Sequence, residues 1–252
     1  MFEVTVLAIL QGIAEFLPIS SSGHLVLGKA LLGVSEPGIR LDVMLHAGTL
    51  LSVTVFYFAV IWRILRNFEW RYMLKVIVSA VPCAIVGILF KTQLESLFAS
   101  PAAVGVALLF TGAVLIATRF LPRGGREVSL PVALAMGVAQ AVAVLPGVSR
   151  SGMTIAAARA SKVDGEKAAE FSFLMSVPPI AGAALLEVLD SLKASDPAAD
   201  GTAWPLVVYG GLVAAVVGFV ALKLLLRSLR GDRFWLFGVY CLAAGTVTIL
   251  VG

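Results

Sequence analysis

Two short polar segments hold the side chains of this chain that are best suited to chemistry. Glu15 and His24 lie in the first segment and Arg150 lies in the second, while the surrounding sequence is strongly apolar. An ionisable group is costly in hydrocarbon, so such a group usually lines a cavity, pairs with a partner or binds a ligand. We therefore expect function to reside in these segments. They read Gln11-Gly-Ile-Ala-Glu15-Phe-Leu-Pro-Ile-Ser-Ser-Ser-Gly-His24 and Leu145-Pro-Gly-Val-Ser-Arg-Ser-Gly-Met-Thr154.

The second segment has the composition of a phosphate site. Arg150 offers a planar fork of donors that suits phosphate oxygens. Ser149 and Ser151 flank it, and Thr154 follows one helical turn later. Arg150 could instead end a helix or contact a lipid head group, but the neighbouring Pro, Gly, Ser and Thr residues favour an anion cradle. We predict that these four residues bind phosphate.

The first segment brings together a carboxylate, hydroxyls and an imidazole. Gln11 and Glu15 are four residues apart and so share one face of a helix. Glu15 could hold a divalent cation or act as a general base. Ser21 or Ser22 could be a nucleophile, although serines here could equally cap a helix. The candidate catalytic residues are Glu15, Ser21, His24 and Arg150, and Ser20 and Ser22 are further candidates for phosphate contacts.

Three more polar residues are predicted to support the site. His46 lies in the apolar stretch after the first segment, where a hydrogen bond between helices is an equal alternative. Glu170 could orient Arg150 or interact with the end of a cytoplasmic helix. Gln140 stands in Gly137-Val-Ala-Gln140, which is similar to Gly12-Ile-Ala-Glu15. We expect His46, Gln140 and Glu170 to surround the reacting groups.

The composition identifies the environment in which these segments must be positioned. Of the 252 residues 60% are hydrophobic and 13% are charged, whereas soluble domains have about 45–50% and about 25%. We predict an all-α integral membrane protein with six transmembrane helices of about 20 residues each. Cys83 and Cys241 fall within these helices and are expected to be free thiols. The predicted spans are residues 41–62, 74–90, 101–120, 169–188, 204–226 and 234–252.

Basic residues gather in four loops between the predicted spans. A soluble basic face is therefore absent, and we expect no nucleic-acid partner despite the net charge of +4. By the positive-inside rule these loops face the cytoplasm. Their basic residues are Arg63, Arg66, Arg71 and Lys75; Arg119, Arg123 and Arg126; Arg159, Lys162 and Lys167; and Lys223, Arg227, Arg230 and Arg233.

This topology predicts one membrane domain, residues 1–252, built as an inverted repeat. The two halves, approximately 1–122 and 128–252, have opposite orientations, and each begins with a re-entrant helix-loop-helix hairpin, approximately 1–28 and 128–160. Inverted repeats with broken helices place a site near the bilayer midplane. The two polar loops should meet there, with helix N-termini directed at an anion.

The motifs resemble those of the bacterial undecaprenyl-diphosphate phosphatase family, which is linked to bacitracin resistance. They are Gln11-x-x-x-Glu15, Ser20-Ser-Ser-Gly-His24, Pro146-Gly-Val-Ser-Arg-Ser-Gly-Met-Thr154 and Glu170-Phe-Ser-Phe-Leu, and the resemblance covers essentially the whole chain. It implies an enzyme of the bacterial inner membrane that removes the terminal phosphate of the C55 polyprenyl diphosphate. The product carries glycan for cell-wall synthesis, and bacitracin competes by binding the substrate.

The resemblance also implies a divalent cation, Mg or Ca, a homodimer, and a site that opens to the periplasmic side. The family's acidic motif falls on Gln11 and Glu15 as metal ligands, and Gln11 supplies a neutral ligand where other members often have Glu. Its Ser-Ser-x-Gly-His motif falls on Ser20, Ser21 and His24. The attacking group stays open between Ser21, His24 and water.

The motifs allow two other interpretations to be compared with this one. Type 2 phosphatidic-acid-phosphatase-like enzymes need a second His six residues after the Arg, where this chain has Ala156, so that family is excluded. A polyprenyl-phosphate flippase is the alternative from another class, because secondary transporters also use inverted repeats and midplane anion sites. A carrier needs no nucleophile and base, which favours the enzyme.

Overall fold

The computed structural model describes the whole chain except residues 35–38, 91–96, 98–99, 194–202 and 252. Within the described part the regular structure is helical, and the only β-type pairing is an isolated bridge between Arg126 and Val163. The helices are α1 (Phe2–Phe16), α2 (Ser21–Leu32), α3 (Ile39–Phe56), α4 (Phe58–Arg66), α5 (Trp70–Leu89), α7 (Pro101–Ala117), the 3-10 turn η1 (Thr118–Phe120), α8 (Leu130–Val142), α9 (Arg150–Ala160), α10 (Gly165–Lys193), α11 (Trp204–Arg230) and α12 (Leu236–Val251).

Both polar segments form a helix, a loop and a second helix, in the α1–α2 and α8–α9 pairs. The second helix of each pair begins in the same way. Ser20 caps α2 by accepting a hydrogen bond from the amide of Gly23 (3.3 Å), and Ser149 caps α9 by accepting one from Gly152 (3.1 Å). A serine at this position satisfies an amide that the helix itself leaves free. Local sequence therefore fixes where both loops end.

The two loops meet, as the sequence predicts. A Cβ placed on Gly23 would lie 3.0 Å from the Cα of Gly147, and one placed on Gly152 would lie 3.3 Å from the Cβ of Pro18. Gly147 has φ +94° and lies so close to α7 that a Cβ there would be 2.5 Å from the carbonyl oxygen of Val104. Glycine at these positions allows the two backbones to approach each other.

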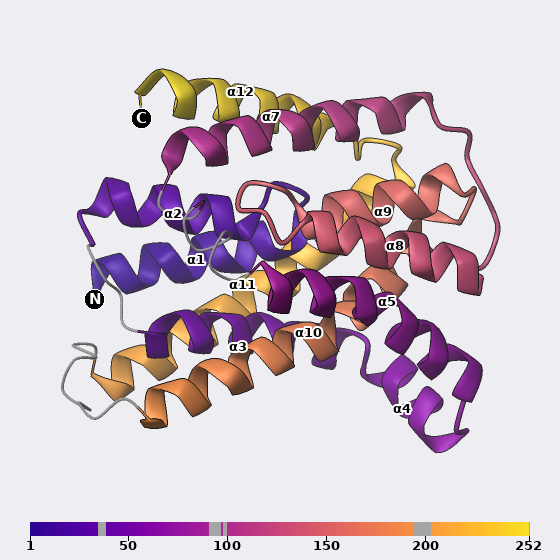
Figure 1. Ribbon diagram of the computed structural model, residues 1–252, viewed down its shortest axis with the longest axis horizontal. Helices are drawn as coiled ribbons and strands as arrows, with labels where there is room; N and C mark the ends of the chain where they lie inside the picture. Colours follow the sequence, from indigo (N-terminus) through magenta and orange to yellow (C-terminus); the bar gives the residue numbers. More distant parts are fainter. Residues whose placement is uncertain (35–38, 91–96, 98–99, 194–202, 252) are drawn as a thin grey trace.

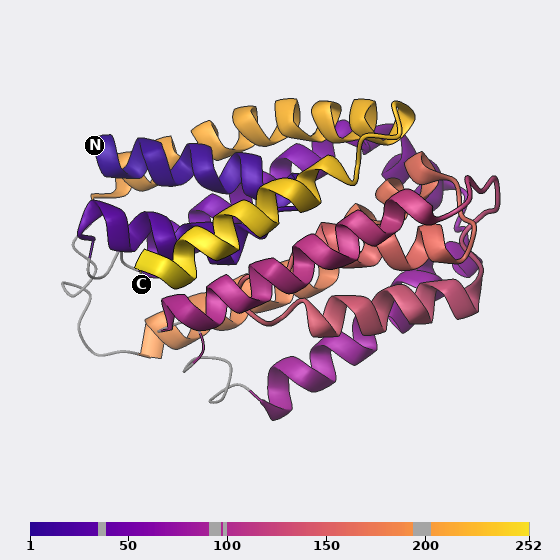
Figure 2. The same cartoon turned by 90° about the horizontal axis from the view of Figure 1, so that it is seen from above.

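Long apolar helices surround the hairpins. α7 and α12 run side by side at one edge of the molecule, α3 and α10 pack together at another, and α11 lies against α1 and α3 (Figures 1 and 2). Gly105 and Gly112 of α7 face Gly245 and Gly238 of α12, where added Cβ atoms would lie 3.1 and 2.9 Å from the facing carbonyl oxygens. Small residues permit this close packing, which is typical of helices in membranes.

Among the residues that the structure describes, three helical segments are long and apolar enough to cross a membrane: α5, residues 101–120 (α7 with η1) and α11. α3 and α4 together would make a fourth, but they are bent by 71°. The predicted span over 41–62 is thus divided between two helices at Tyr57, and its crossing of the membrane stays a prediction. α4 is amphipathic and ends with Arg63 and Arg66, a composition suited to the membrane interface rather than its interior.

The other predicted spans correspond to helices of different lengths. Residues 169–188 fall within α10, whereas residues 234–252 correspond to α12, a helix of 16 residues. A straight span needs about 20 residues. The arrangement of six spans and two re-entrant hairpins thus remains a prediction, while the all-helical class is confirmed.

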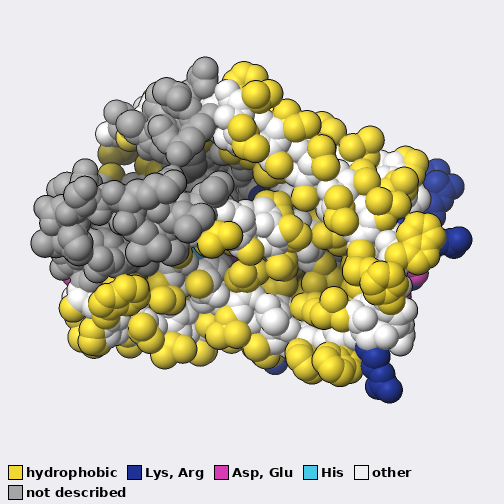
Figure 3. All heavy atoms as spheres, turned by 60° about the horizontal axis from the view of Figure 1, so that its bottom comes forward, with side chains coloured by type: hydrophobic (Ala, Val, Ile, Leu, Met, Phe, Trp, Pro, Cys, Tyr) yellow, Lys and Arg dark blue, Asp and Glu magenta, His cyan; other side chains and the backbone are white. Residues whose placement is uncertain are grey.

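The surface has the character expected of a chain surrounded by lipid. Hydrophobic side chains cover much of the described face in Figure 3, and several Lys and Arg side chains gather at one end. On α5, Ile77, Val81 and Ile85 are all exposed. Cys83 and Cys241 are both free, as predicted. Apolar surface of this extent is unfavourable in water, so the fold is that of a multi-pass membrane protein.

Candidate active site

An ion pair joins the two polar segments. Arg150, the first residue of α9, donates from Nη2 to Oε1 of Glu15 in the last turn of α1. Only 16% of the Arg150 side chain and 7% of the Glu15 side chain are exposed. The guanidinium also lies 5.8 Å from the ring centroid of Phe173, within the range of a cation–π contact. The pair neutralises two charges that would otherwise be buried alone.

The second carboxylate oxygen of Glu15 accepts two hydrogen bonds. Ser21 Oγ donates to Oε2 at 2.6 Å, and Gln11 Nε2 donates to the same oxygen at 3.1 Å. A hydroxyl that donates to a carboxylate is the arrangement in which a base can activate a nucleophile. The structure therefore brings together Gln11, Glu15, Ser21 and Arg150 from the predicted site.

His24 is held by two partners beside this group. Its Nδ1 lies 2.9 Å from the carbonyl oxygen of Ser20, which can only accept, so Nδ1 carries a proton. Its Nε2 lies 2.7 Å from the hydroxyl of Tyr240, whose ring stacks on the imidazole. Sequence reasoning missed Tyr240, because a tyrosine in an apolar stretch near a chain end gives no indication of its partner.

The serines of the second loop satisfy backbone groups and each other. Ser149 Oγ, which caps α9, lies 3.4 Å from Ser151 Oγ. Thr154 donates to the carbonyl oxygen of Arg150 at 2.8 Å and lies 2.6 Å from Ser172 Oγ, so its hydroxyl is engaged within the helices. Thr111 of α7 was not predicted, yet it anchors the loop. It accepts from the amide of Ser149 (3.1 Å) and donates to the carbonyl oxygen of Gly147 (3.0 Å).

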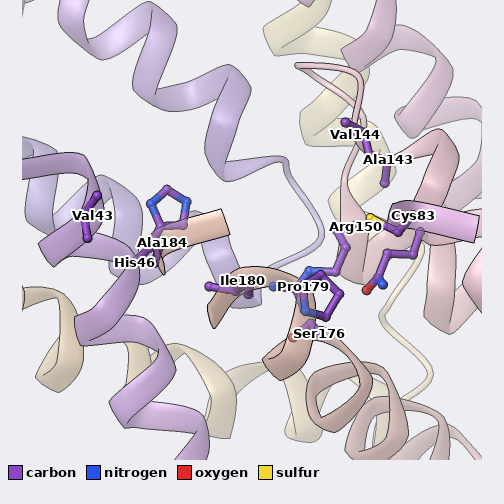
Figure 4. A pocket seen from close by; sticks show the side chains of 11 residues that line it. Val43, His46, Cys83, Ala143, Val144, Arg150, Ser176, Pro179, Ile180 and Ala184 are labelled. Carbon is purple, nitrogen blue, oxygen red and sulfur yellow. The ribbon is translucent and has the colours of Figure 1, made fainter. Parts of the chain in front are cut away.

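Two adjoining cavities meet at Arg150. The smaller, of about 180 Å³, is rich in hydroxyl groups, and the larger, of about 250 Å³, is mostly apolar. Figure 4 shows Arg150 at the larger cavity, between Pro179 and Ser176 on one side and Val144 on the other. Both cavities are lined by Arg150, His46, Ala143, Val144 and Ile180. The polar residues of the smaller cavity are Glu15, Ser20, Ser21, Ser22, His46, Ser149, Arg150 and Ser151.

Some of the remaining predicted residues line the cavities and others do not. His46 lines both cavities and Gln140 lines the larger one, whereas Glu170 lines neither. Glu170 lies in α10 and is half-buried. The carboxylate that pairs with Arg150 is that of Glu15. His24 and Thr154 line neither cavity.

The donor set near Glu15 is compatible with a cation that prefers oxygen ligands. The described residues contain no group of three or more His, Cys, Asp or Glu side chains that could hold a metal ion. Gln11 Oε1 is nevertheless buried and without a partner among them, while Nε2 of the same amide donates to the Glu15 carboxylate. Mg²⁺ is typically bound by one or two carboxylates together with water and substrate phosphates. Gln11 and Glu15 thus supply an amide oxygen and a carboxylate, the donor types that such an ion prefers.

These features define a class of protein: a helical membrane protein with a buried arginine, carboxylate and hydroxyl cluster at an internal cavity. The sequence model of the family described as Bacitracin resistance protein BacA matches residues 4–247. The chain belongs to this family.

Relatives of full length share about two fifths of their residues with this chain. A protein of Desulfatibacillum aliphaticivorans named undecaprenyl-diphosphatase is 40% identical over 274 residues, covering 99% of this chain and 97% of the relative. Proteins of the same name from Rhodopirellula baltica and Bacteroides thetaiotaomicron are 39% and 38% identical, and the alignments cover at least 97% of each chain.

Proposed function

We propose that this protein hydrolyses undecaprenyl diphosphate to undecaprenyl phosphate and inorganic phosphate. The reaction recycles the lipid carrier of cell-wall synthesis and confers resistance to bacitracin, which binds the same substrate. The observation that carries the proposal is the Ser21 hydroxyl donating to the Glu15 carboxylate, in the wall of a cavity that also contains Arg150. The name shared by the full-length relatives supports it.

Arg150 performs the first task, which is to bind the diphosphate. Its guanidinium is already largely buried, and a charge-assisted contact with phosphate is strong in such surroundings. The diphosphate competes with Glu15 for the guanidinium, so binding weakens the ion pair and releases the carboxylate. Ser149 and Ser151, in the same cavity wall, supply further hydroxyl groups.

Glu15 then acts as the base. As Ser21 Oγ attacks the terminal phosphorus in line, its proton passes to Glu15, and the bond to the bridging oxygen breaks with its electrons leaving on undecaprenyl phosphate. Water then hydrolyses the phosphoserine and regenerates Ser21. Direct attack by water, with Glu15 as base, is the alternative sequence. His24, held by Ser20 and Tyr240, takes or returns a proton.

Gln11 Oε1 and Glu15 would hold Mg or Ca, which would neutralise negative charge on the diphosphate. The unpaired amide oxygen of Gln11 supports this assignment. Two protein ligands would leave the other coordination positions to water and substrate phosphates, so cation and diphosphate should strengthen each other's binding.

We assign the chain six spans and two re-entrant hairpins, with halves 1–122 and 128–252 related as an inverted repeat. The matching contacts of α1 with α11 and of α8 with α5 support this assignment, as do the equivalent serine caps of α2 and α9. The protein lies in the bacterial inner membrane with the site open to the periplasmic side, and it forms a homodimer. The basic loops favour the orientation.

A polyprenyl-phosphate flippase remains the second candidate. It too would need a buried anion site, but transport requires no hydroxyl bonded to a carboxylate. The contact between Ser21 and Glu15 therefore favours hydrolysis.

Phosphate release distinguishes the two. Purified protein in detergent, given undecaprenyl diphosphate with Mg, with Ca or with chelator, should release inorganic phosphate only when a cation is present. Glu15→Ala and Arg150→Ala should abolish release, while Arg123→Ala, at a side chain that is 76% exposed, should retain it. Folded protein that releases no phosphate under any condition would favour the flippase.

A further inference from the structure

The larger cavity contains two buried polar groups that lack a partner among the described residues. Gln140 is 3% exposed, and neither its Oε1 nor its Nε2 has a hydrogen-bond partner. Arg150 Nη1 is unpartnered as well, although Nη2 of the same guanidinium binds Glu15. Buried polar groups are nearly always paired, so an amide and a guanidinium nitrogen left open at one cavity indicate a ligand.

The two cavities differ in polarity, and this difference predicts how a diphosphate is oriented between them. The smaller cavity contains Glu15 and Ser21, the groups of the proposed chemistry. The larger cavity is lined mainly by apolar side chains, among them Val43, Val144 and Ile180, and suits the prenyl end of the substrate. Arg150 lines both. The terminal phosphate therefore belongs in the smaller cavity, and the phosphate that carries the prenyl chain belongs beside Gln140.

We propose that the side chain of Gln140, together with Arg150 Nη1, binds the phosphate that stays on the lipid. This inference rests on the proposed diphosphatase function and adds a substrate contact to it. Gln140 Nε2 donates to a phosphate oxygen, while Oε1 accepts from water or from a protonated phosphate oxygen. A neutral donor holds the monophosphate product without a second buried cation, which favours product release.

Substitution of Gln140 by methionine keeps an unbranched side chain of similar length and removes both polar atoms. Losing a hydrogen bond to a charged group should raise both the KM for undecaprenyl diphosphate and the inhibition constant of undecaprenyl phosphate by about tenfold or more. The kcat should fall much less, because the scissile bond lies on the other side of Arg150. Gln140→Glu should raise the KM and the inhibition constant further, because its carboxylate would repel the phosphate.

Thr248→Val is the matched control. Thr248 is also a buried polar residue, but its hydroxyl is satisfied by the carbonyl oxygen of Ala244 and it lines neither cavity. Its KM and product inhibition should equal those of the wild type. An unchanged KM and product inhibition in Gln140→Met, or tighter lipid binding by Gln140→Glu, would overturn the proposal.

Cys83 gives a second test that needs no substitution of Gln140. It lines the same cavity, whereas Cys241 is fully buried and lines neither cavity. Undecaprenyl phosphate should slow alkylation of Cys83 by N-ethylmaleimide in the native protein, and inorganic phosphate alone should not. Peptide mass spectrometry measures the labelling, with Cys83→Ser confirming the modified site. Full labelling at saturating undecaprenyl phosphate would contradict occupancy of this cavity.

These tests separate the inference from the function on which it rests. Wild-type protein that releases no phosphate contradicts the diphosphatase assignment itself. Wild-type protein that is active, with Gln140→Met showing a reduced kcat and an unchanged KM, retains the function and rejects the binding role of Gln140.

Discussion

Arg150 and Glu15 are separated by 135 positions in the sequence, yet the guanidinium of one donates directly to the carboxylate of the other. Glu15 lies in the last turn of α1, just before the first loop, and Arg150 is the first residue of α9, just after the second loop. It is the point at which the two polar segments become one site.

Breaking this pair should affect activity and stability separately. Arg150→Lys keeps the charge but loses the planar fork, so kcat should fall by at least about a hundredfold.

Arg150→Ala leaves an unpaired buried carboxylate, at a cost of about 3–5 kcal/mol. The double variant Glu15→Ala/Arg150→Ala should therefore melt at a higher temperature than Arg150→Ala, as measured by thermal unfolding in detergent. A double variant that melts lower than both single variants would contradict the ion pair.

Ser21 should be essential to the chemical step. Ser21→Ala removes the hydroxyl that donates to Glu15 at 2.6 Å, and kcat should fall by about a thousandfold or more with a smaller change in KM. Ser22→Ala serves as comparison, because the Ser22 hydroxyl contacts only Ser20 at 3.3 Å among the described residues. It should lose less than about tenfold, as expected for one phosphate contact among several. Equal losses would shift the attacking role to water.

Cation binding should respond to the charge of residue 11. Gln11→Glu places a second carboxylate beside Glu15 and should lower the concentration of Mg or Ca that gives half-maximal activity. Gln11→Leu removes the amide oxygen that has no partner among the described residues and should raise that cation concentration. A titration of phosphate release against each cation measures both effects. If neither substitution moves the midpoint, Gln11 is not a ligand.

Tyr240 should influence turnover through His24. Tyr240→Phe removes the hydroxyl that lies 2.7 Å from Nε2 but keeps the stacked ring, so kcat should fall by roughly threefold to tenfold. Tyr209→Phe removes a hydroxyl that contacts Thr5 and should have no effect on turnover. Steady-state kinetics of the two variants makes the comparison. Equal activities for both would show that Tyr240 only packs against the ring.

Gly147 should tolerate no side chain. Alanine there would be strained at φ +94°, and its Cβ would lie 2.5 Å from the carbonyl oxygen of Val104, so we expect a loss of more than about 2 kcal/mol. Gly87→Ala, at a position where an added Cβ meets nothing within 4 Å, should leave the melting temperature unchanged or raise it. Unaltered melting of Gly147→Ala would mean that the second loop is not held tightly against α7.

The sequence by itself determined the membrane class, the two polar loops and the functional groups that they carry. Burying charge in hydrocarbon costs so much that Glu15 and Arg150 stand out without any knowledge of the fold. Proline and serine signals also indicate locally where the helices flanking the loops end and begin. Those features depend on short stretches of chain.

Tertiary structure decided the contacts made across apolar helices. Which helices become neighbours decides four features of the site. These are the contact of Tyr240 with His24, the hydrogen bonds of Thr111 with the second loop, the unpartnered amide of Gln140 among the described residues, and the position of Glu170 outside both cavities. In a chain whose helices are apolar on most faces, hydrophobic periodicity does not indicate which face meets which partner. The bend between α3 and α4 escaped prediction for the same reason, since neither Pro nor Gly marks Tyr57 and the apolar run continues through it.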